Sequence, residues 1–412
     1  MNQGGRKAAI ECLRSVFQHS VKADAVLEKS LQYVQPRERG LLYELVYGVL
    51  RRRYSLEADF SRFCKSKPDD ISEAALLLGT YQLRHMRVPS HAAVSETVAA
   101  VKQLSPKAAG FVNAILRRVA DSEPPAKLKP NQRAELPKWI YAQWRDAFGG
   151  DAVQSFCGAL KQPPPLCVAV FVERDEWMAQ LREMGIQSET GELSPYAVLL
   201  PVGTPVTSLP GFDDGNFTVM DQAAQAAVMS LDLVNPSGLI IDLCAAPGGK
   251  TALLSHRFPD AQIIAVELNG RRMPRLSENL GRLKCSNVSV IQADALTLPL
   301  ADCSVDAVLL DAPCSASGIL RRHPDGKFLH DADDVEALSR MQRKMVCESL
   351  RVLKSSADLT YAVCSIHPEE NEQVVDGMSG VSGMKRLFPA THNDGFFHAC
   401  IEKRSIENYE RR

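Results

Sequence analysis

Two cysteines and one acidic residue follow strand-like runs in the last third of the sequence. Residues 307–310, Ala-Val-Leu-Leu, are typical of a strand that is buried on both faces, and Asp311 and Cys314 come shortly after them. Residues 359–363 form a second strand-like run, which is followed by Cys364. Open α/β sheets bind ligands beyond the carboxyl ends of their strands, so we expect one crevice that holds a carboxylate and two thiols.

A loop with two glycines follows an earlier strand-like run. Residues 242–251 read Asp-Leu-Cys-Ala-Ala-Pro-Gly-Gly-Lys-Thr, and a helical pattern begins at their end. Small residues and glycines let a ligand approach the backbone closely. The loop matches neither the dinucleotide-binding pattern GxGxxG nor the phosphate-binding pattern GxxxxGK[ST]. It therefore favours a nucleoside without phosphates.

Acidic residues stand at the ends of the next two expected strands. Glu267 ends one strand, where a carboxylate can accept hydrogen bonds from both ribose hydroxyls, and Asp294 follows the other, placed to bind an adenine amino group. Each acid alone is more often a helix cap or a surface charge. Together they favour S-adenosylmethionine, whose methyl group is carried by a positively charged sulfur. The residues expected to contact it are Cys244, Ala245, Ala246, Pro247, Gly248, Gly249, Lys250, Glu267, Asp294 and Asp311.

The elements that would position these residues alternate between strand and helix from about residue 217. Strands are expected at 239–243, 263–267, 288–291, 307–310, 359–363 and 396–401, which predicts an α/β fold with a parallel, doubly wound sheet. Helical spacing without strand patterns predicts an all-helical bundle over residues 1 to about 120. The predicted domains are a helical domain at 1–125, a small α+β subdomain at 131–215 and a catalytic domain at 216–405, with a proline-rich linker after residue 120.

The composition of the chain limits the classes of partner that it is expected to bind. Residues 1–145 hold 24 Lys and Arg against 14 Asp and Glu, and the remainder holds 24 against 35. A basic N-terminal third suits a polyanion, although a solvated helical surface explains the charge equally well. No apolar run reaches the ~18 residues of a membrane span, and the eleven cysteines include no CxxC pair. We therefore expect a cytoplasmic protein with free thiols, no membrane partner and no metal.

Three motifs resemble those of the Nol1/Nop2/Sun family of RNA cytosine-C5 methyltransferases. They are residues 242–251, residues 310–315 (Leu-Asp-Ala-Pro-Cys-Ser) and residues 363–371 (Val-Cys-Ser-Ile-His-Pro-Glu-Glu-Asn). Residues 321–325 and 393–398 are similar to the Sun (Fmu) branch, and residues 45–51, 88–96 and 111–117 resemble its NusB-like RNA-binding domain. The resemblance implies a Rossmann-like class I methyltransferase domain, S-adenosylmethionine as donor and one cytosine of 16S ribosomal RNA as acceptor. We expect a monomer.

The resemblance also assigns roles to the two thiols. Carbon 5 of cytosine becomes nucleophilic when a thiolate adds to carbon 6, which is covalent catalysis. By the resemblance, Cys364 is this nucleophile, Cys314 assists proton removal and product release, and Asp311 hydrogen-bonds the cytosine. An ordinary thiol, with a pKa of ~8.5, is only a few per cent thiolate at neutral pH. We therefore expect Lys250 to lie nearby and favour the thiolate.

Two other functions stay open. The same catalytic residues would serve a transfer RNA cytosine-C5 methyltransferase, and only the N-terminal domain and residues 321–325 speak against it. A non-catalytic RNA-binding or ribosome-assembly factor could keep the same fold, but the two intact thiols argue against that function.

Overall fold

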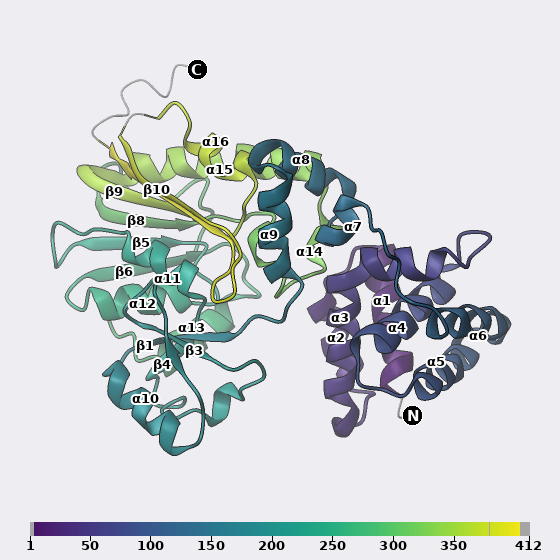
Figure 1. Ribbon diagram of the computed structural model, residues 1–412. Helices are drawn as coiled ribbons and strands as arrows, with labels where there is room; N and C mark the ends of the chain where they lie inside the picture. Colours follow the sequence, from purple (N-terminus) through teal and green to yellow (C-terminus); the bar gives the residue numbers. More distant parts are fainter. Residues whose placement is uncertain (1–3, 379, 404–412) are drawn as a thin grey trace. The chain divides into compact units, whose positions relative to one another are not determined.

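The computed structural model describes residues 4–378 and 380–403, which form two compact units (Figure 1). One unit contains the chain up to Gln162 together with Leu320–Ala332, and the other contains Pro163–Ile319 and the chain from Asp333 onward. Residues 404 and 405, at the end of the predicted catalytic domain, lie outside the described residues. The three predicted domain boundaries remain predictions.

The first unit is built from helices, as the spacing of apolar residues predicts. Proline stands at the start of α3 and α6, where its missing N–H is not needed, and the Asp69 side chain caps α4 through the N–H groups of Ile71 and Ser72. One buried apolar cluster joins the first six helices. The helices are α1 (Gly5–His19), α2 (Ala23–Leu31), α3 (Pro36–Ser61), α4 (Asp70–His85), α5 (Ser90–Leu104), α6 (Pro106–Ala120), α7 (Pro130–Ala134), α8 (Lys138–Phe148) and α9 (Gly150–Leu160).

The segment Leu320–Ala332 belongs to this helical unit, although it follows the Cys314 loop in sequence. It contains the short helix α14 (Gly326–Leu329), whose Phe328 packs edge-on against Phe17 with ring centroids 5.3 Å apart. The Asp325 carboxylate accepts the backbone N–H of Ala23 at 2.9 Å, at the start of α2. These contacts join the segment to the core and to a helix end of the unit.

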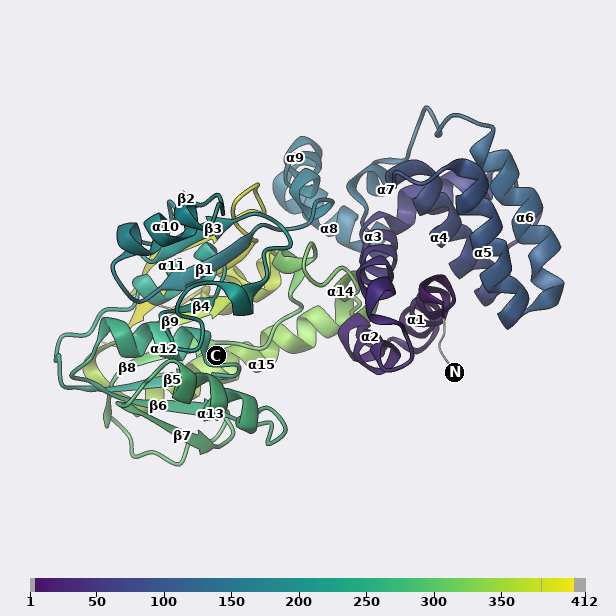
Figure 2. The same cartoon turned by 90° about the horizontal axis from the view of Figure 1, so that it is seen from below.

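The second unit opens with a small antiparallel sheet of order β2-β3-β1-β4. Helix α10 (Arg174–Glu183) lies against this sheet, as the α+β pattern predicts (Figure 2). Its Trp177 and Leu181 pack with the buried side chains of β1 and β3. The strands are β1 (Leu166–Val170), β2 (Glu189–Thr190), β3 (Ala197–Leu200) and β4 (Phe217–Val219).

The main sheet has seven strands in the order β10-β11-β9-β8-β5-β6-β7, and Figure 1 shows β9, β8, β5 and β6 stacked in that order. Strands β5 to β9 are parallel, but β11 runs antiparallel to β9 and β10 antiparallel to β11. The prediction of a wholly parallel sheet is therefore wrong at this edge, because β11 pairs with β9 in the opposite direction. The strands are β5 (Leu239–Leu243), β6 (Gln262–Glu267), β7 (Val288–Gln292), β8 (Val305–Asp311), β9 (Leu353–Val363), β10 (Val381–Leu387) and β11 (Phe396–Glu402).

Alternate residues of the central strands face two different layers of helices. Ile240 and Leu309 pack with α11 (Gln222–Met229) and α12 (Gly249–Arg257), whereas Ile241 and Leu310 pack with α15 (Ala332–Val352). Helix α13 (Met273–Arg282) lies on the same side as α12. Because both faces are covered, the central strands read as continuous apolar runs. The α/β fold class is confirmed, as are the helical N-terminal region and the small α+β sheet.

Candidate active site

The site lies at the point where the strand order reverses. Strand β5 has β6 on one side and β8 on the other, and Asp242 of β5 and Asp311 of β8 lie near the carboxyl ends of these two strands. Connections leave the sheet in opposite directions at such a point, which opens a crevice there. Strand β9 is next to β8, with Ala362 paired to Asp311, so that Cys364 follows at the same edge.

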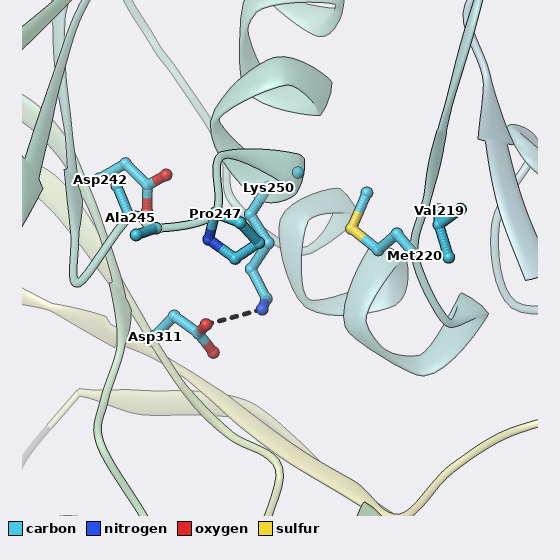
Figure 3. Close-up of a pocket in the computed structure, with 9 residues that line it drawn as sticks. Val219, Met220, Asp242, Ala245, Pro247, Lys250 and Asp311 are labelled. Carbon is cyan, nitrogen blue, oxygen red and sulfur yellow. Dashed lines mark hydrogen bonds and ion pairs between the residues drawn. The ribbon is translucent and has the colours of Figure 1, made fainter. Parts of the chain in front are cut away.

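A pocket occupies this crevice, between the glycine loop and the end of β8 (Figure 3). Lys250 of α12 lies on one side and forms an ion pair with Asp311, with 2.7 Å between Nζ and Oδ2. Burial alone would lower the pKa of Lys250, but the Asp311 carboxylate, with smaller contributions from Cys364 and Asp242, raises it. Lys250 is therefore a cation held beside an acid. The lining residues are Val219, Met220, Asp242, Ala245, Ala246, Pro247, Gly249, Lys250 and Asp311.

The Asp242 carboxylate is fully buried at the back of the glycine loop. Its Oδ2 accepts the Thr251 hydroxyl at 2.5 Å, and its Oδ1 has no partner in the part of the chain that the structure describes. Burial raises the pKa of Asp242 to about 7, against the hydrogen bond from Thr251, and the charge on Asp311 adds to the increase. Asp242 thus offers an unused acceptor oxygen beside the pocket.

The two predicted thiols lie together. The Sγ atoms of Cys314 and Cys364 are 3.4 Å apart, although the residues are 50 positions apart in the chain. The hydrogen bond to Cys364 raises the pKa of Cys314 well above its ordinary value, and burial and the nearby charges of Cys364 and Glu370 add to this. The structure brings together Cys314, Cys364, Asp311 and Lys250 at one edge of the sheet, and their catalytic roles remain predictions.

Close backbone packing holds the loop after Cys314. The Gly318 carbonyl accepts the N–H of Gly395 at 2.9 Å, and a Cβ atom on Gly318 would lie 2.2 Å from the Gly395 oxygen. Only a residue without a side chain fits between these two backbones. The Gly318 N–H also donates to the Cys364 carbonyl at 2.9 Å, so the same residue connects the two cysteine loops.

The other predicted cofactor residues surround the pocket less closely. Glu267 is buried, and its carboxylate accepts the Asn269 N–H at 2.9 Å and pairs with Arg272 at 3.0 Å. Asp294 accepts the N–H of Leu296 at 2.9 Å and does not belong to the lining set. The predicted ribose and adenine contacts of these two acids remain predictions.

Cys244 and Gly248 adopt positive φ angles within the glycine loop. Cys244 has a φ of 62°, and burial, together with the charges of Asp311 and Glu267, raises the pKa of its thiol to about 12. Gly248 has a φ of 100°, and a Cβ atom there would lie 2.9 Å from the Leu276 side chain. The backbone shape of the loop therefore depends on glycine at this position.

These features fit S-adenosylmethionine. The pocket combines a backbone loop free of large side chains with the carboxylates of Asp242 and Asp311, and a carboxylate suits the positive charges of the donor's sulfonium and ammonium groups. Asp242 Oδ1 is a buried acceptor without a hydrogen-bond partner among the described residues, and an N–H or O–H group of a bound ligand would satisfy it.

Within residues 4–378 and 380–403, no group of three His, Cys, Asp or Glu side chains could hold a metal ion. Among the described helices, none is long and apolar enough to cross a membrane.

Sequence reasoning missed several residues that line or support the site. Val219 at the end of β4 and Met220, which follows it, line the pocket. Glu370 and Gln342 form hydrogen bonds to the loop that carries Cys314. Glu370 lies inside a motif that the sequence presents, but no pattern indicates that its side chain points toward the cysteines.

Comparison with known proteins decides the family. Family models match residues 228–381 as "16S rRNA methyltransferase RsmB/F", residues 3–121 as the NusB family and residues 136–207 as the ferredoxin-like domain of RsmF/B-like methyltransferases. Proteins named ribosomal RNA small subunit methyltransferase B are 34% identical in Klebsiella pneumoniae, over 97% of this chain and 98% of theirs, and 34% identical in Vibrio cholerae, over 97% of both. The chain belongs to the ribosomal RNA small subunit methyltransferase B family. The predicted resemblance to this branch is thereby confirmed.

Two solved structures have a fold similar to that of this chain. A structure titled "Crystal Structure of PH0851" has a TM-score of 0.79 at 20% identity and covers 98% of this chain and 99% of its own. A methyltransferase homologue from Pyrococcus horikoshii has a TM-score of 0.57 at 25% identity, over 66% of this chain and 96% of its own. The NusB-like helical region and the Rossmann-like methyltransferase fold are confirmed.

Proposed function

We propose that this chain transfers a methyl group from S-adenosylmethionine to carbon 5 of one cytosine in 16S ribosomal RNA, through a covalent bond between Cys364 and carbon 6. The observation that carries the proposal is the pair of thiols 3.4 Å apart, beside a pocket that contains the Lys250–Asp311 ion pair. The relatives named as small-subunit ribosomal RNA methyltransferases support the choice of RNA.

Each residue of the site has a step to perform. The Cys364 thiolate adds to carbon 6, which makes carbon 5 nucleophilic, and Asp311 hydrogen-bonds the base at N3 or the amino group. The positive charge of Lys250 favours the thiolate form of Cys364 and holds Asp311 in place. When bound, S-adenosylmethionine supplies an electrophilic methyl group to carbon 5. Cys314, after giving up its own proton, then accepts the carbon-5 proton, the electron pair of that C–H bond forms the C5–C6 double bond, and the bond from carbon 6 to Cys364 breaks with its electrons returning to sulfur.

The RNA must present its base outside a regular helix. Carbon 5 belongs to the base, so the target cytosine must be single-stranded, looped or flipped into the site. The basic helical region would contact phosphates, and binding should weaken as salt increases. We propose that the enzyme acts as a cytoplasmic monomer on this RNA.

The decisive experiment compares wild type and Cys364→Ala in methyl incorporation into small-subunit RNA. Wild type should form 5-methylcytosine, and Cys364→Ala should form none. No incorporation by wild type would favour a non-catalytic assembly factor, and incorporation only into transfer RNA would favour the other substrate. Mapping 5-methylcytosine in ribosomal RNA from a deletion strain identifies the target nucleotide.

A second experiment tests the division of roles between the thiols. Cys314→Ala should still form the covalent bond through Cys364 but release product slowly. A stable protein–RNA adduct should then appear as a shifted band on a denaturing gel. The band should vanish in the double variant Cys314→Ala/Cys364→Ala, and its absence in the single variant would contradict the assigned roles.

A further inference from the structure

A buried carboxylate lies behind the two cysteines and binds both of their loops. Glu370 is fully buried, and its Oε1 accepts the Ser315 backbone N–H at 2.8 Å and Gln342 Nε2 at 3.1 Å. Its Oε2 accepts the hydroxyls of Ser315 at 2.5 Å and Ser365 at 2.6 Å. Ser315 directly follows Cys314 and Ser365 directly follows Cys364, so one side chain joins the two segments that present the thiols.

Further hydrogen bonds make this connection specific. Ser317 Oγ lies 3.0 Å from Ser365 Oγ and accepts the Ile366 N–H at 3.1 Å. These serine hydroxyls are buried together with Glu370. Each bond joins the segment after Cys314 to the segment after Cys364, so the connection does not depend on one contact alone.

Two residues hold Glu370 itself. Gln342 of α15 donates to its carboxylate and also to the Pro313 carbonyl at 2.8 Å, one residue before Cys314. The Tyr361 hydroxyl of β9 lies 2.6 Å from the Glu370 carbonyl, to which it donates. The helix on one face of the sheet therefore holds the carboxylate of Glu370, and a strand of the sheet holds its backbone. Its position depends on buried partners, as a charge in an apolar interior requires.

The negative charge of Glu370 acts on the Cys314 thiol, within a pair of sulfurs that lie close together. Two sulfurs 3.4 Å apart do not both ionise readily, because the second negative charge would face the first. The hydrogen bond with Cys364 and burial raise the pKa of Cys314, and the charges of Cys364 and Glu370 raise it further. In the enzyme without RNA, a proton shared by the pair is therefore drawn to Cys314.

We propose that Glu370 is a positioning residue that fixes the two cysteine loops to each other and keeps the proton on Cys314, so that Cys364 is the nucleophile. The inference rests on the proposed function for the roles of the thiols. It adds the physical reason why two neighbouring cysteines of the same chemical type would take different roles.

Alkylation of the enzyme without RNA and without methyl donor tests whether the charge of Glu370 keeps the proton on Cys314. Wild type and Glu370→Gln are treated with iodoacetamide between about pH 6.5 and 9.5, and labelled cysteines are identified by mass spectrometry. In wild type, Cys364 should be alkylated at lower pH than Cys314. In Glu370→Gln, Cys314 should react at lower pH, and the ratio of Cys314 to Cys364 labelling at neutral pH should rise several-fold.

A neighbouring acid supplies the matched control. Glu372 is two residues further along, is 42% exposed and pairs with Arg386. Glu372→Gln removes the same charge and should leave the labelling ratio unchanged. An unchanged ratio in folded Glu370→Gln, or an equal change in Glu372→Gln, would overturn the assignment of charge control to Glu370.

Glu370→Asp tests the geometry and replaces Glu370→Gln if that variant does not fold. Aspartate keeps the charge but is one methylene shorter, so the labelling order should persist while the loops loosen. Oxidised glutathione converts the two thiols to one disulfide and is itself reduced to two glutathione molecules. This reaction should slow several-fold in Glu370→Asp because the sulfurs are no longer held together. An unchanged rate, or a lost labelling order, would contradict the positioning role.

These readouts separate this inference from the proposed function. If wild type makes no 5-methylcytosine but the labelling shifts as expected, the function is wrong and the placement of the proton stands. If wild type is active and the labelling does not shift, only the role of Glu370 is wrong.

Discussion

Each unit of the molecule contains a buried charged cluster, and the two clusters do different work. In the catalytic unit, Glu370 contacts the loops of two thiols at the edge of a pocket. In the helical unit, Lys327 is buried and its Nζ donates to the carbonyls of Arg51 at 3.2 Å and Glu135 at 2.9 Å. Both lower the cost of irregular backbone in the interior, but the first lies between the loops of two thiols whose Sγ atoms are 3.4 Å apart.

The helical cluster supports a break in α3. Arg52 has non-helical angles, φ −114° and ψ 18°, and the N–H groups of Tyr54 and Ser55 follow this break. The buried Glu135 carboxylate accepts these groups, at 2.9 Å from Tyr54 and 3.3 Å from Ser55. The cluster thus satisfies backbone groups that the helix leaves open, which is a structural role.

The comparison shows that a buried charge alone does not identify a functional site. Burial lowers the pKa of Lys327 to about 8, a large change for a lysine that we assign no chemistry. The Glu370 cluster differs because its charge lies beside two thiols at the carboxyl ends of parallel strands. Four experiments test this contrast, beginning with the largest expected effect.

Replacement of Lys250 should reduce activity far more than stability. Lys250→Met removes the partner of Asp311 and the cation beside Cys364, so the methyl-transfer rate should fall by about 10³-fold. Initial rates with small-subunit RNA measure this loss of activity. The free energy of unfolding, measured with denaturant, should change by less than about 1 kcal/mol. Lys344→Met, at an exposed position of α15, is the control and should keep the wild-type rate. A rate within tenfold of wild type would contradict a catalytic role for Lys250.

Replacement of Lys327 should reduce stability far more than activity. Lys327→Met leaves the Arg51 and Glu135 carbonyls without this donor and the Glu135 carboxylate without a nearby cation, which should cost about 3 kcal/mol of unfolding free energy. Urea unfolding of the helical unit measures the loss. Lys107→Met, exposed on α6, should leave it unchanged. If Lys327→Met unfolds like wild type but is inactive, the contrast between the clusters fails.

Removal of one aromatic ring should have a smaller effect on the same unit. Phe328→Leu keeps an apolar side chain but loses the edge-on contact with Phe17, which should cost about 1 kcal/mol. The shift of the unfolding midpoint measures this loss of stability. The control is Phe111→Leu, which replaces an exposed ring of α6. Equal effects of the two substitutions would show that the segment Leu320–Ala332 contributes no specific packing.

The last test is the pH dependence of the stability that Lys327→Met loses relative to wild type. The folded pKa of Lys327 is about 8, below the unfolded value of about 10.4, so the unfolded chain binds more protons between these values. The contribution of Lys327 to the unfolding free energy of wild type therefore rises as the pH increases from about 8 to about 10.4. The variant lacks this gain, so its deficit should grow over that range. A deficit that shrinks with increasing pH would contradict the lowered pKa.

Much of the fold follows from local patterns. The strands at Leu239–Leu243 and Ala197–Leu200 and the helices α5 and α6 agree with their apolar periodicity to within a few residues. Strand β10 was not predicted, because most of its residues are exposed and it has no clear alternation. Nothing in the composition of Leu320–Ala332 indicates that it packs with helices from the other end of the chain.

The sequence by itself determined which residue types follow each strand: the glycine loop after β5, the acid and thiol after β8 and the thiol after β9. It also determined the family, because these motifs and the N-terminal helices extend over nearly the whole chain. Only the tertiary structure decided that the two sulfurs lie 3.4 Å apart and that Glu370 is the acid that joins their loops. The physical reason is that periodicity reports which face of an element is buried, whereas distances between side chains depend on strand register and packing between segments far apart in the chain.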